Sequence, residues 1–279
     1  MMLDQVEANT LIRERILSND LLSAGKIGNS ERIGLVQAFN GGIDDYGTEN
    51  LHFNAGVYPP KPGVLYKFCE KYVESIRNVN VFAQWIADGT GGFVEAPIID
   101  QISPNSTRVH SRSLEPFYHE NPWSSALEGK RVLVVSPFGE TIKKQYEKRE
   151  LLWEDTTVLP EFELQTLRTP MSAGISTPEF DTWFDGLEYF ENRIKQINPE
   201  FVIVGAGAWS LPIVSYCSTL GIDALHMGGG TQILFGIKGK RWDDHDVISG
   251  FYNEHWTRPS GNEIPENMNN MRIDTGHYW

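Results

Sequence analysis

An apolar run, a glycine-rich turn and a helix-like segment follow one another in FVIVGAGAWSLPIVSYCSTLG, residues 201–221. Such a turn exposes backbone N–H groups and a helix N-terminus, which favour an anion such as phosphate. A dinucleotide fingerprint would also need a third glycine and an acid at the end of the next strand. Ser210 replaces that glycine, and Asp223 begins the next strand instead of ending it. The pattern disfavours NAD and leaves another phosphate loop or a merely tight connection.

Two more turns could serve the same edge of a sheet. Gly228-Gly229-Gly230 follows the strand expected over residues 222–227, which predicts a second opening beside the first. In GKIGNSERIGL, a turn at Gly28 is followed by Asn29 or Ser30 as a helix cap and by Glu31 in the first turn. Ordinary capping explains these residue types, and a carboxylate that faces a ligand is the functional alternative.

Several other side chains could take part in the transfer of a group from a diphosphate. Glu161 and Glu163 alternate along a predicted strand, which allows a catalytic base there or a solvated edge. Asn54 lies in a loop that could line a sugar site, and Trp209 could stack on a base or pack in the core. Asp244-His245-Asp246 follows a basic loop and not a strand, so we attribute its metal-like spacing to chance. The cations that could meet a diphosphate are Lys26, Arg32, Arg112 and Arg149, the last at the end of a helix whose strand feeds the same edge.

The elements that must hold these residues alternate between strand and helix in the second half of the chain. Runs such as VLVV and FVIV lack polar alternation, which is typical of parallel strands buried on both faces. We therefore predict a Rossmann-like α/β fold: a mostly parallel sheet with helices on both faces. Residues 1–279 are expected to form a single domain, with 241–279 as an extended tail wrapped on the core. Residues 93–99, FVEAPII, are predicted as a further strand.

The composition and charge of the chain argue against several classes of binding partner. The net charge is −13 and no window holds five clustered Lys and Arg, which argues against nucleic acid and against an anionic membrane surface. The longest apolar runs are strand-length, so no integral membrane segment is expected. Cys69 and Cys217 are interpreted as buried thiols from a reducing compartment. We expect a cytoplasmic protein, and the oligomeric state, including a homo-oligomer, stays open.

Two of these segments resemble the GT-D class of glycosyltransferases. Gly28-Asn29-Ser30-Glu31 is similar to the Gly-Asp-Gly-Glu turn of that class, which carries an Asp-x-Glu motif for the nucleotide-sugar and its metal. GAGAWSLPIVSYCSTLGIDALHMGGG resembles its closing block. LEGKRVLVVSPFGETIKKQYEKRE, VLPEFEL and a final YW resemble related bacterial and viral proteins that accompany polysaccharide-making enzymes. Asn29 departs from the motif, because an amide oxygen is a weaker metal ligand than a carboxylate.

The resemblance implies a glycosyltransferase of surface polysaccharide or glycoprotein glycan synthesis. Its partners would be a UDP- or GDP-linked sugar donor and a saccharide acceptor, and its cofactor Mn²⁺ or Mg²⁺ at Glu31 and Asn29. Glu31 and Glu163 are the predicted catalytic residues. The predicted donor-binding residues are Gly28, Asn29, Ser30, Arg32, Asn54, Arg149, Gly205, Gly207, Trp209, Ser210 and Gly229.

Two alternatives stay open. One is another nucleotide-using α/β enzyme, such as a dehydrogenase or a methyltransferase. The other is a catalytically silent nucleotide-sugar-binding module, which the replacement of the motif's Asp by Asn29 makes credible.

Overall fold

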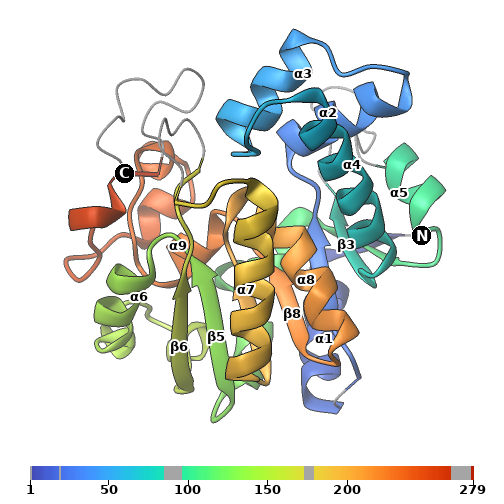
Figure 1. Ribbon diagram of the computed structural model, residues 1–279. Helices are drawn as coiled ribbons and strands as arrows, with labels where there is room; N and C mark the ends of the chain where they lie inside the picture. The colour runs from blue at the N-terminus through green and yellow to red at the C-terminus, as the bar shows by residue number, and fades with distance from the viewer. Residues whose placement is uncertain (1, 19, 85–95, 173–178, 265–277) are drawn as a thin grey trace.

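The computed structural model describes residues 2–18, 20–84, 96–172, 179–264 and 278–279 (Figure 1). Their strands form one sheet of eight, in the order β1-β4-β3-β2-β8-β7-β5-β6, and each pairing between neighbours in this order is parallel. The strands are β1 (Met2–Leu3), β2 (Ser23–Lys26), β3 (Val81–Gln84), β4 (Thr107–His110), β5 (Arg131–Ser136), β6 (Glu163–Arg168), β7 (Phe201–Val204) and β8 (Asp223–His226). The predicted α/β fold is confirmed.

The central strands are apolar on both sides because both faces of the sheet are covered. Val132 and Val134 of β5 pack into the core on one face, and Leu133 and Val135 pack into the core on the other. Strand β7 divides its side chains in the same way. A sheet that lies between two helical layers therefore explains why runs such as VLVV are apolar throughout.

The helices divide between these layers. The helices are α1 (Gln5–Ser18), α2 (Asn29–Phe39), α3 (Asp45–Glu49), α4 (Pro62–Arg77), α5 (Ala96–Ile102), α6 (Gly139–Tyr146), α7 (Trp183–Ile197), α8 (Ser210–Thr219) and α9 (Gly230–Leu234). Figure 1 looks onto the face covered by α7 and α8, whose core also takes residues of α4, whereas α1 and α6 contribute to the opposite core. Among the helices that the structure describes, none is both long and apolar enough to cross a membrane.

The connections between strands diverge between β5 and β7. The chain leaves β5 for the edge strand β6, and it leaves β7 in the opposite direction for β8, which pairs with β2. A crevice opens outside the carboxyl ends of the strands at such a point. The turns after β5 and β7 therefore lie at the natural ligand site of this sheet, with the turns after β8 and β2 beside them.

The described part of the C-terminal segment packs on the core that contains α1 and α6. Trp242, Trp256 and Trp279 are buried there. The Glu263 carboxylate accepts hydrogen bonds from the backbone N–H groups of Glu140, at 2.8 Å, and Thr141, at 3.1 Å, in the first turn of α6. Glu263 thus accepts from N–H groups in the first turn of α6 that have no partner within the helix.

The sequence-based assignment of residues 93–99 is wrong where the structure describes them. Residues 93–95 lie outside the described residues, and Ala96–Ile102 form α5 instead of a strand. Ile98 and Ile99 are buried in the α4 layer, so their apolar character reflects packing of a short helix and not a place in the sheet.

Trp209 is a core residue and does not reach the cavity described below. Its side chain is 1% exposed, its Nε1–H donates to the Trp183 carbonyl at 3.0 Å, and the two indole rings stack 6.2 Å apart. The prediction that Trp209 stacks on a donor is therefore wrong, because α7 covers the position.

Replacing Trp209 with Ala should lower the free energy of unfolding by about 3–5 kcal/mol, since the change leaves a cavity and removes a large buried apolar surface. Denaturant unfolding followed by circular dichroism would measure the loss. Tyr46→Ala, at an aromatic residue that is 60% exposed, is the control and should change stability by less than about 0.5 kcal/mol. Equal effects of the two substitutions would contradict the core assignment.

Candidate functional site

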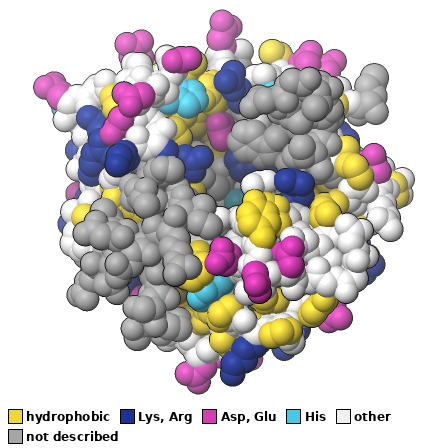
Figure 2. All heavy atoms as spheres, turned by 90° about the horizontal axis from the view of Figure 1, so that it is seen from above, with side chains coloured by type: hydrophobic (Ala, Val, Ile, Leu, Met, Phe, Trp, Pro, Cys, Tyr) yellow, Lys and Arg dark blue, Asp and Glu magenta, His cyan; other side chains and the backbone are white. Residues whose placement is uncertain are grey.

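A cavity of about 850 Å³ opens at the carboxyl edge of the sheet. Figure 2 looks down on this edge, where Lys and Arg side chains border a hollow near the centre of the view. The turns after β2, β5, β6, β7 and β8 line it, namely 26–31, 136–138, 169–172, 205–207 and 228–233. Arg112, Glu115 and the C-terminal residues Arg241 and Tyr278 complete one side.

The early acidic turn and the late glycine turns meet in this cavity. Glu31 and Gly207 both line it, although 175 residues lie between them in the chain. The predicted site residues that line the cavity are Gly28, Asn29, Ser30, Glu31, Asn54, Gly205, Gly207 and Gly229. Lys26 and Arg112, expected as diphosphate cations, line it too.

The structure does not bring the other predicted residues to the cavity. Glu163 begins β6, and the parallel register pairs it with Arg131 at the amino edge, the opposite end of the sheet from the cavity. Arg149 forms an ion pair with Glu161, with 2.9 Å between Nη2 and Oε2, and does not line the cavity. Glu163 is thus an exposed residue at the beginning of a strand, and Arg149 belongs to a surface ion pair.

Ser210 and Arg32 support the site from behind its wall. The buried Ser210 hydroxyl accepts a hydrogen bond from the Ala206 N–H at 2.9 Å, which closes the turn after β7. The Arg32 guanidinium donates to Asn29 Oδ1 at 2.8 Å. Neither side chain lines the cavity, so each acts on a residue that does.

The helix cap expected at Asn29 or Ser30 is absent. Helix α2 is capped at Gly28, whose extended backbone supplies no side-chain hydrogen bond. The Glu31 side chain folds back over this residue: a Cβ at position 28 would collide with the Glu31 carboxylate. A side chain at position 28 would therefore force the Glu31 carboxylate to move, so the two residues form one unit at the cavity wall.

Glu31 is a buried acid. It is 7% exposed, and burial raises the pKa of its carboxyl group, while a hydrogen bond from its own backbone acts in the opposite direction. The Tyr72 phenol lies close enough for the two groups to interact electrostatically and also bonds the backbone of Gly28. A buried carboxyl group at a cavity with a raised pKa is a common feature of sites that transfer protons.

Backbone forms the floor of the cavity where β7 and β8 end. A Cβ on Gly205 would lie 2.6 Å from the Thr231 hydroxyl oxygen and 2.7 Å from the Gly228 carbonyl oxygen. Gly207 and Gly228 have φ angles of 56° and 63°, the left-handed region that side chains rarely adopt. The glycines thus allow two tight turns and their close approach, and the same absence of side chains leaves backbone groups open to a ligand.

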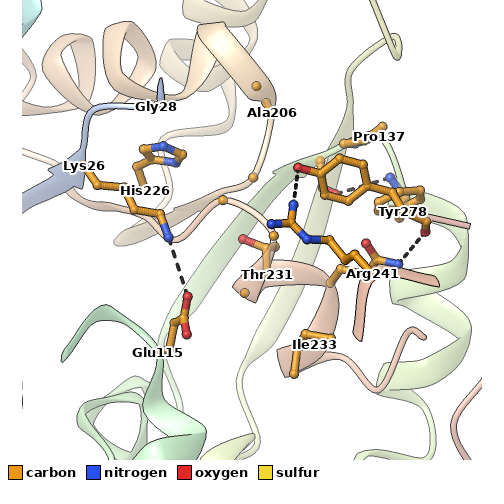
Figure 3. Close-up of a pocket in the computed structure, with 18 of the residues that line it drawn as sticks. Lys26, Gly28, Glu115, Pro137, Ala206, His226, Thr231, Ile233, Arg241 and Tyr278 are labelled. Carbon is orange, nitrogen blue, oxygen red and sulfur yellow. Dashed lines mark hydrogen bonds and ion pairs between the residues drawn. The ribbon is translucent and has the colours of Figure 1, made fainter. Parts of the chain in front are cut away.

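Three cations border the cavity. The Lys26 ammonium lies 3.5 Å from Glu115 Oε1, with its side chain 11% exposed, and burial lowers its pKa. Arg241 donates to the Tyr278 hydroxyl at 3.0 Å and lies 5.1 Å from the Trp242 ring. Figure 3 shows Lys26 and Arg241 on two sides of the cavity with Thr231 between them. Arg112, which lies over the Tyr118 ring, is the third.

His226 ends β8 beside Lys26. Burial, together with the Lys26 charge, lowers the pKa of its imidazole to about 3, so the ring is neutral at physiological pH. Nδ1 lies 3.3 Å from the Val204 carbonyl oxygen and donates to it in the tautomer that this contact favours. Nε2 is then a hydrogen-bond acceptor on a residue that lines the cavity.

The sequence-based prediction missed His226, Glu115, Arg241 and Tyr278. The sequence could have indicated His226, because this residue ends a strand whose following turn was already assigned to the site. It could not have indicated Arg241 and Tyr278, because they come from the segment expected to be a tail and only the packing of that segment brings them to the cavity.

The charge of the cavity differs from that of the chain. Among the described residues that line it, the charged side chains other than His are Lys26, Arg112, Arg241, Glu31 and Glu115, three cations and two acids. The whole chain carries −13. Cations therefore outnumber acids in the cavity although the chain as a whole is acidic, and this local balance suits an anionic ligand.

The described residues near Asn29 do not fit a divalent metal. The amide oxygen of Asn29 already accepts from the Arg32 guanidinium, which places a positive charge where the ion would be. The described parts of the chain contain no group of three or more His, Cys, Asp and Glu side chains that could hold a metal. The metal expected from the Asp-x-Glu motif stays a prediction.

Two solved structures share the fold over most of the chain. One is a selenomethionine-substituted structure of domain of unknown function 1792, with 10% identity, a TM-score of 0.52, and coverage of 94% of this chain and 92% of that chain. The other, of the same domain and described as a distinct glycosyltransferase fold, has 11% identity, a TM-score of 0.50 and the same coverage. The chain has a glycosyltransferase-like fold. No protein-family model matches the sequence, and no curated protein matches it.

Replacing Glu31 with Gln should raise the thermal unfolding midpoint near pH 7 and have little effect near pH 4. The raised pKa means that the folded state disfavours the carboxylate, so the destabilisation is absent below the ordinary value of 4.5 and grows as the pH rises above it. Differential scanning calorimetry at both pH values would measure the difference. Glu147→Gln, at an exposed position of the chain, is the control. A lower midpoint for Glu31→Gln near pH 7 would show that the carboxylate stabilises the fold.

Proposed function

We propose that this chain is a glycosyltransferase that moves a sugar from a UDP- or GDP-linked donor to a saccharide acceptor, in the synthesis of a surface polysaccharide or a glycoprotein glycan. The observation that supports it most directly is the cavity with three cations at the carboxyl edge of the sheet, in a fold shared with a domain described as a glycosyltransferase fold. Fold alone does not assign a reaction, so the proposal depends on the chemistry of the cavity.

The transfer makes two demands that these residues could meet. An acceptor hydroxyl oxygen forms a bond to the anomeric carbon of the sugar, and the bond from that carbon to the diphosphate oxygen breaks, with its electron pair leaving on the nucleoside diphosphate. Lys26, Arg112 and Arg241 would stabilise the charge that grows on the diphosphate. Glu31, buried at the cavity wall, would accept the proton of the acceptor hydroxyl.

The size of the cavity also suits a nucleotide-sugar. Ligand pockets commonly measure about 300–1,000 Å³, and this one measures about 850 Å³. The cations lie toward β8 and the C-terminal segment, whereas Glu31 and Asn54 lie toward α2. The diphosphate would lie near the former group and the transferred sugar near the latter.

A thermal-shift panel would separate this proposal from its rivals. UDP, GDP and their sugars should raise the unfolding midpoint, because a ligand that binds only the folded state stabilises it. NAD(H) and S-adenosylmethionine should have no effect. Stabilisation by either of the latter compounds, with none by UDP or GDP, would favour a dehydrogenase or a methyltransferase instead.

Replacing Glu31 with Gln should reduce sugar transfer by about 100-fold or more, the usual contribution of a positioned base, while donor binding is kept. Release of nucleoside diphosphate in the presence of an acceptor panel would measure the rate, with Glu147→Gln as the control. Full activity of Glu31→Gln would remove this carboxyl group from the mechanism. Donor binding with no turnover in the unaltered chain would favour the silent binding module, for which the Asn29–Arg32 hydrogen bond is the structural support.

A further inference from the structure

We infer that Lys26, Arg112 and Arg241 bind the donor diphosphate directly and that this binding needs no divalent cation. The inference rests on the proposed function and specifies how the same cavity recognises its substrate. Its basis is the contrast between two parts of the cavity wall. The part where the motif predicts a metal is poor in acidic ligands, and the part between the end of β2 and the C-terminal segment is rich in cations.

The first part is the turn before α2. Asn29 Oδ1 accepts from Arg32 at 2.8 Å, so a metal at this oxygen would displace or face a guanidinium. Glu31 folds over Gly28 and is buried, and it is the one acidic side chain that this turn offers to a metal. These two residues therefore combine one occupied amide oxygen with one buried acid.

The second part is the wall between β2 and the C-terminal segment. Lys26 comes from the end of β2 and Arg241 from the segment that follows α9, and the two are close enough for the Arg241 charge to act on Lys26. Figure 3 shows them on two sides of the turn that carries Thr231. Lys26 is buried and Arg241 is exposed at the rim of the cavity, so a diphosphate that enters from the rim could contact both cations.

The polar groups around these cations are ready for a ligand. The Lys26–Glu115 contact of 3.5 Å is longer than a strong charge-assisted hydrogen bond of about 2.7–2.9 Å, so an incoming phosphate oxygen can compete for the ammonium. Arg241 is fixed by the Tyr278 hydroxyl and the Trp242 ring, which limits the entropy lost on binding. The Thr231 hydroxyl is buried without a hydrogen-bond partner in the described part of the chain, and it lies between the two cations.

The backbone beside these cations is also open. Gly228 lies against Lys26, with 3.3 Å between a Cβ built on it and the lysine Cε. A side chain there would fill the space between the ammonium and the turn. Gly228 thus keeps the approach to the Lys26 ammonium open, which is the arrangement a bulky diphosphate needs.

The test is to titrate UDP and GDP into the full chain by isothermal titration calorimetry, once with EDTA and once with Mn²⁺ or Mg²⁺. The dissociation constant should agree within about twofold between the two conditions. Lys26→Met and Arg241→Met should each weaken binding by about 10- to 100-fold in both conditions, the loss expected for one hydrogen bond to a charged group. Lys195→Met, at an exposed lysine on α7, is the matched control and should bind as the unaltered chain does.

The outcomes separate the inference from the proposed function. Nucleotide binding that appears only with Mn²⁺ or Mg²⁺, or that both Met variants retain, would overturn the inference and leave the glycosyltransferase proposal standing. No binding of UDP or GDP in either condition would overturn both. Thermal unfolding of each variant shows whether it is folded, and because Arg241 lies at the rim of the cavity, Arg241→Met decides the question if Lys26→Met does not fold.

Discussion

The pairing of β2 with β8 is the constraint on which the site depends. The Leu22 N–H donates to the Asp223 carboxylate at 2.8 Å, although the two residues are 201 positions apart in the chain. The Ala224 N–H donates to the Leu22 carbonyl at 2.9 Å. This contact joins an early strand to the last one and so unites the two halves of the sheet. Since the strands are parallel, it also places the residue that ends β2, Lys26, beside the residue that ends β8, His226.

Close contact between the turns follows from that pairing. The end of β7 approaches the end of β8 so closely that Gly205 meets the Gly228 carbonyl and the Thr231 hydroxyl. A tight structural connection and an anion site were alternative interpretations of the glycine turns, but the geometry makes them compatible. The backbone can face a ligand because no side chain fits between the turns.

The site also contains ionisable groups whose charged forms are disfavoured by burial. Lys26, Glu31 and His226 are all buried, and burial disfavours the charged form of each. Ionisable groups with shifted pKa values cluster at functional sites more than elsewhere. Their presence at this cavity agrees with a site there in a chain that is only 10–11% identical to its structural neighbours.

Local patterns in the sequence determined the parallel sheet, the glycine turns and the buried thiols, because a strand covered on both faces must be apolar throughout and a tight turn requires glycine. They did not determine that residues 96–102 form a helix, since a short apolar run packs equally well in either state. Nor did they reveal which charges converge. Lys26, Arg112 and Arg241 lie far apart in the chain, and Arg149 looked as suitable as any of them until the fold placed it beside Glu161. Hydrophobic periodicity records only whether a segment is buried, whereas the meeting of distant side chains depends on the order of the strands and on the path of the C-terminal segment, and these only the tertiary structure decides.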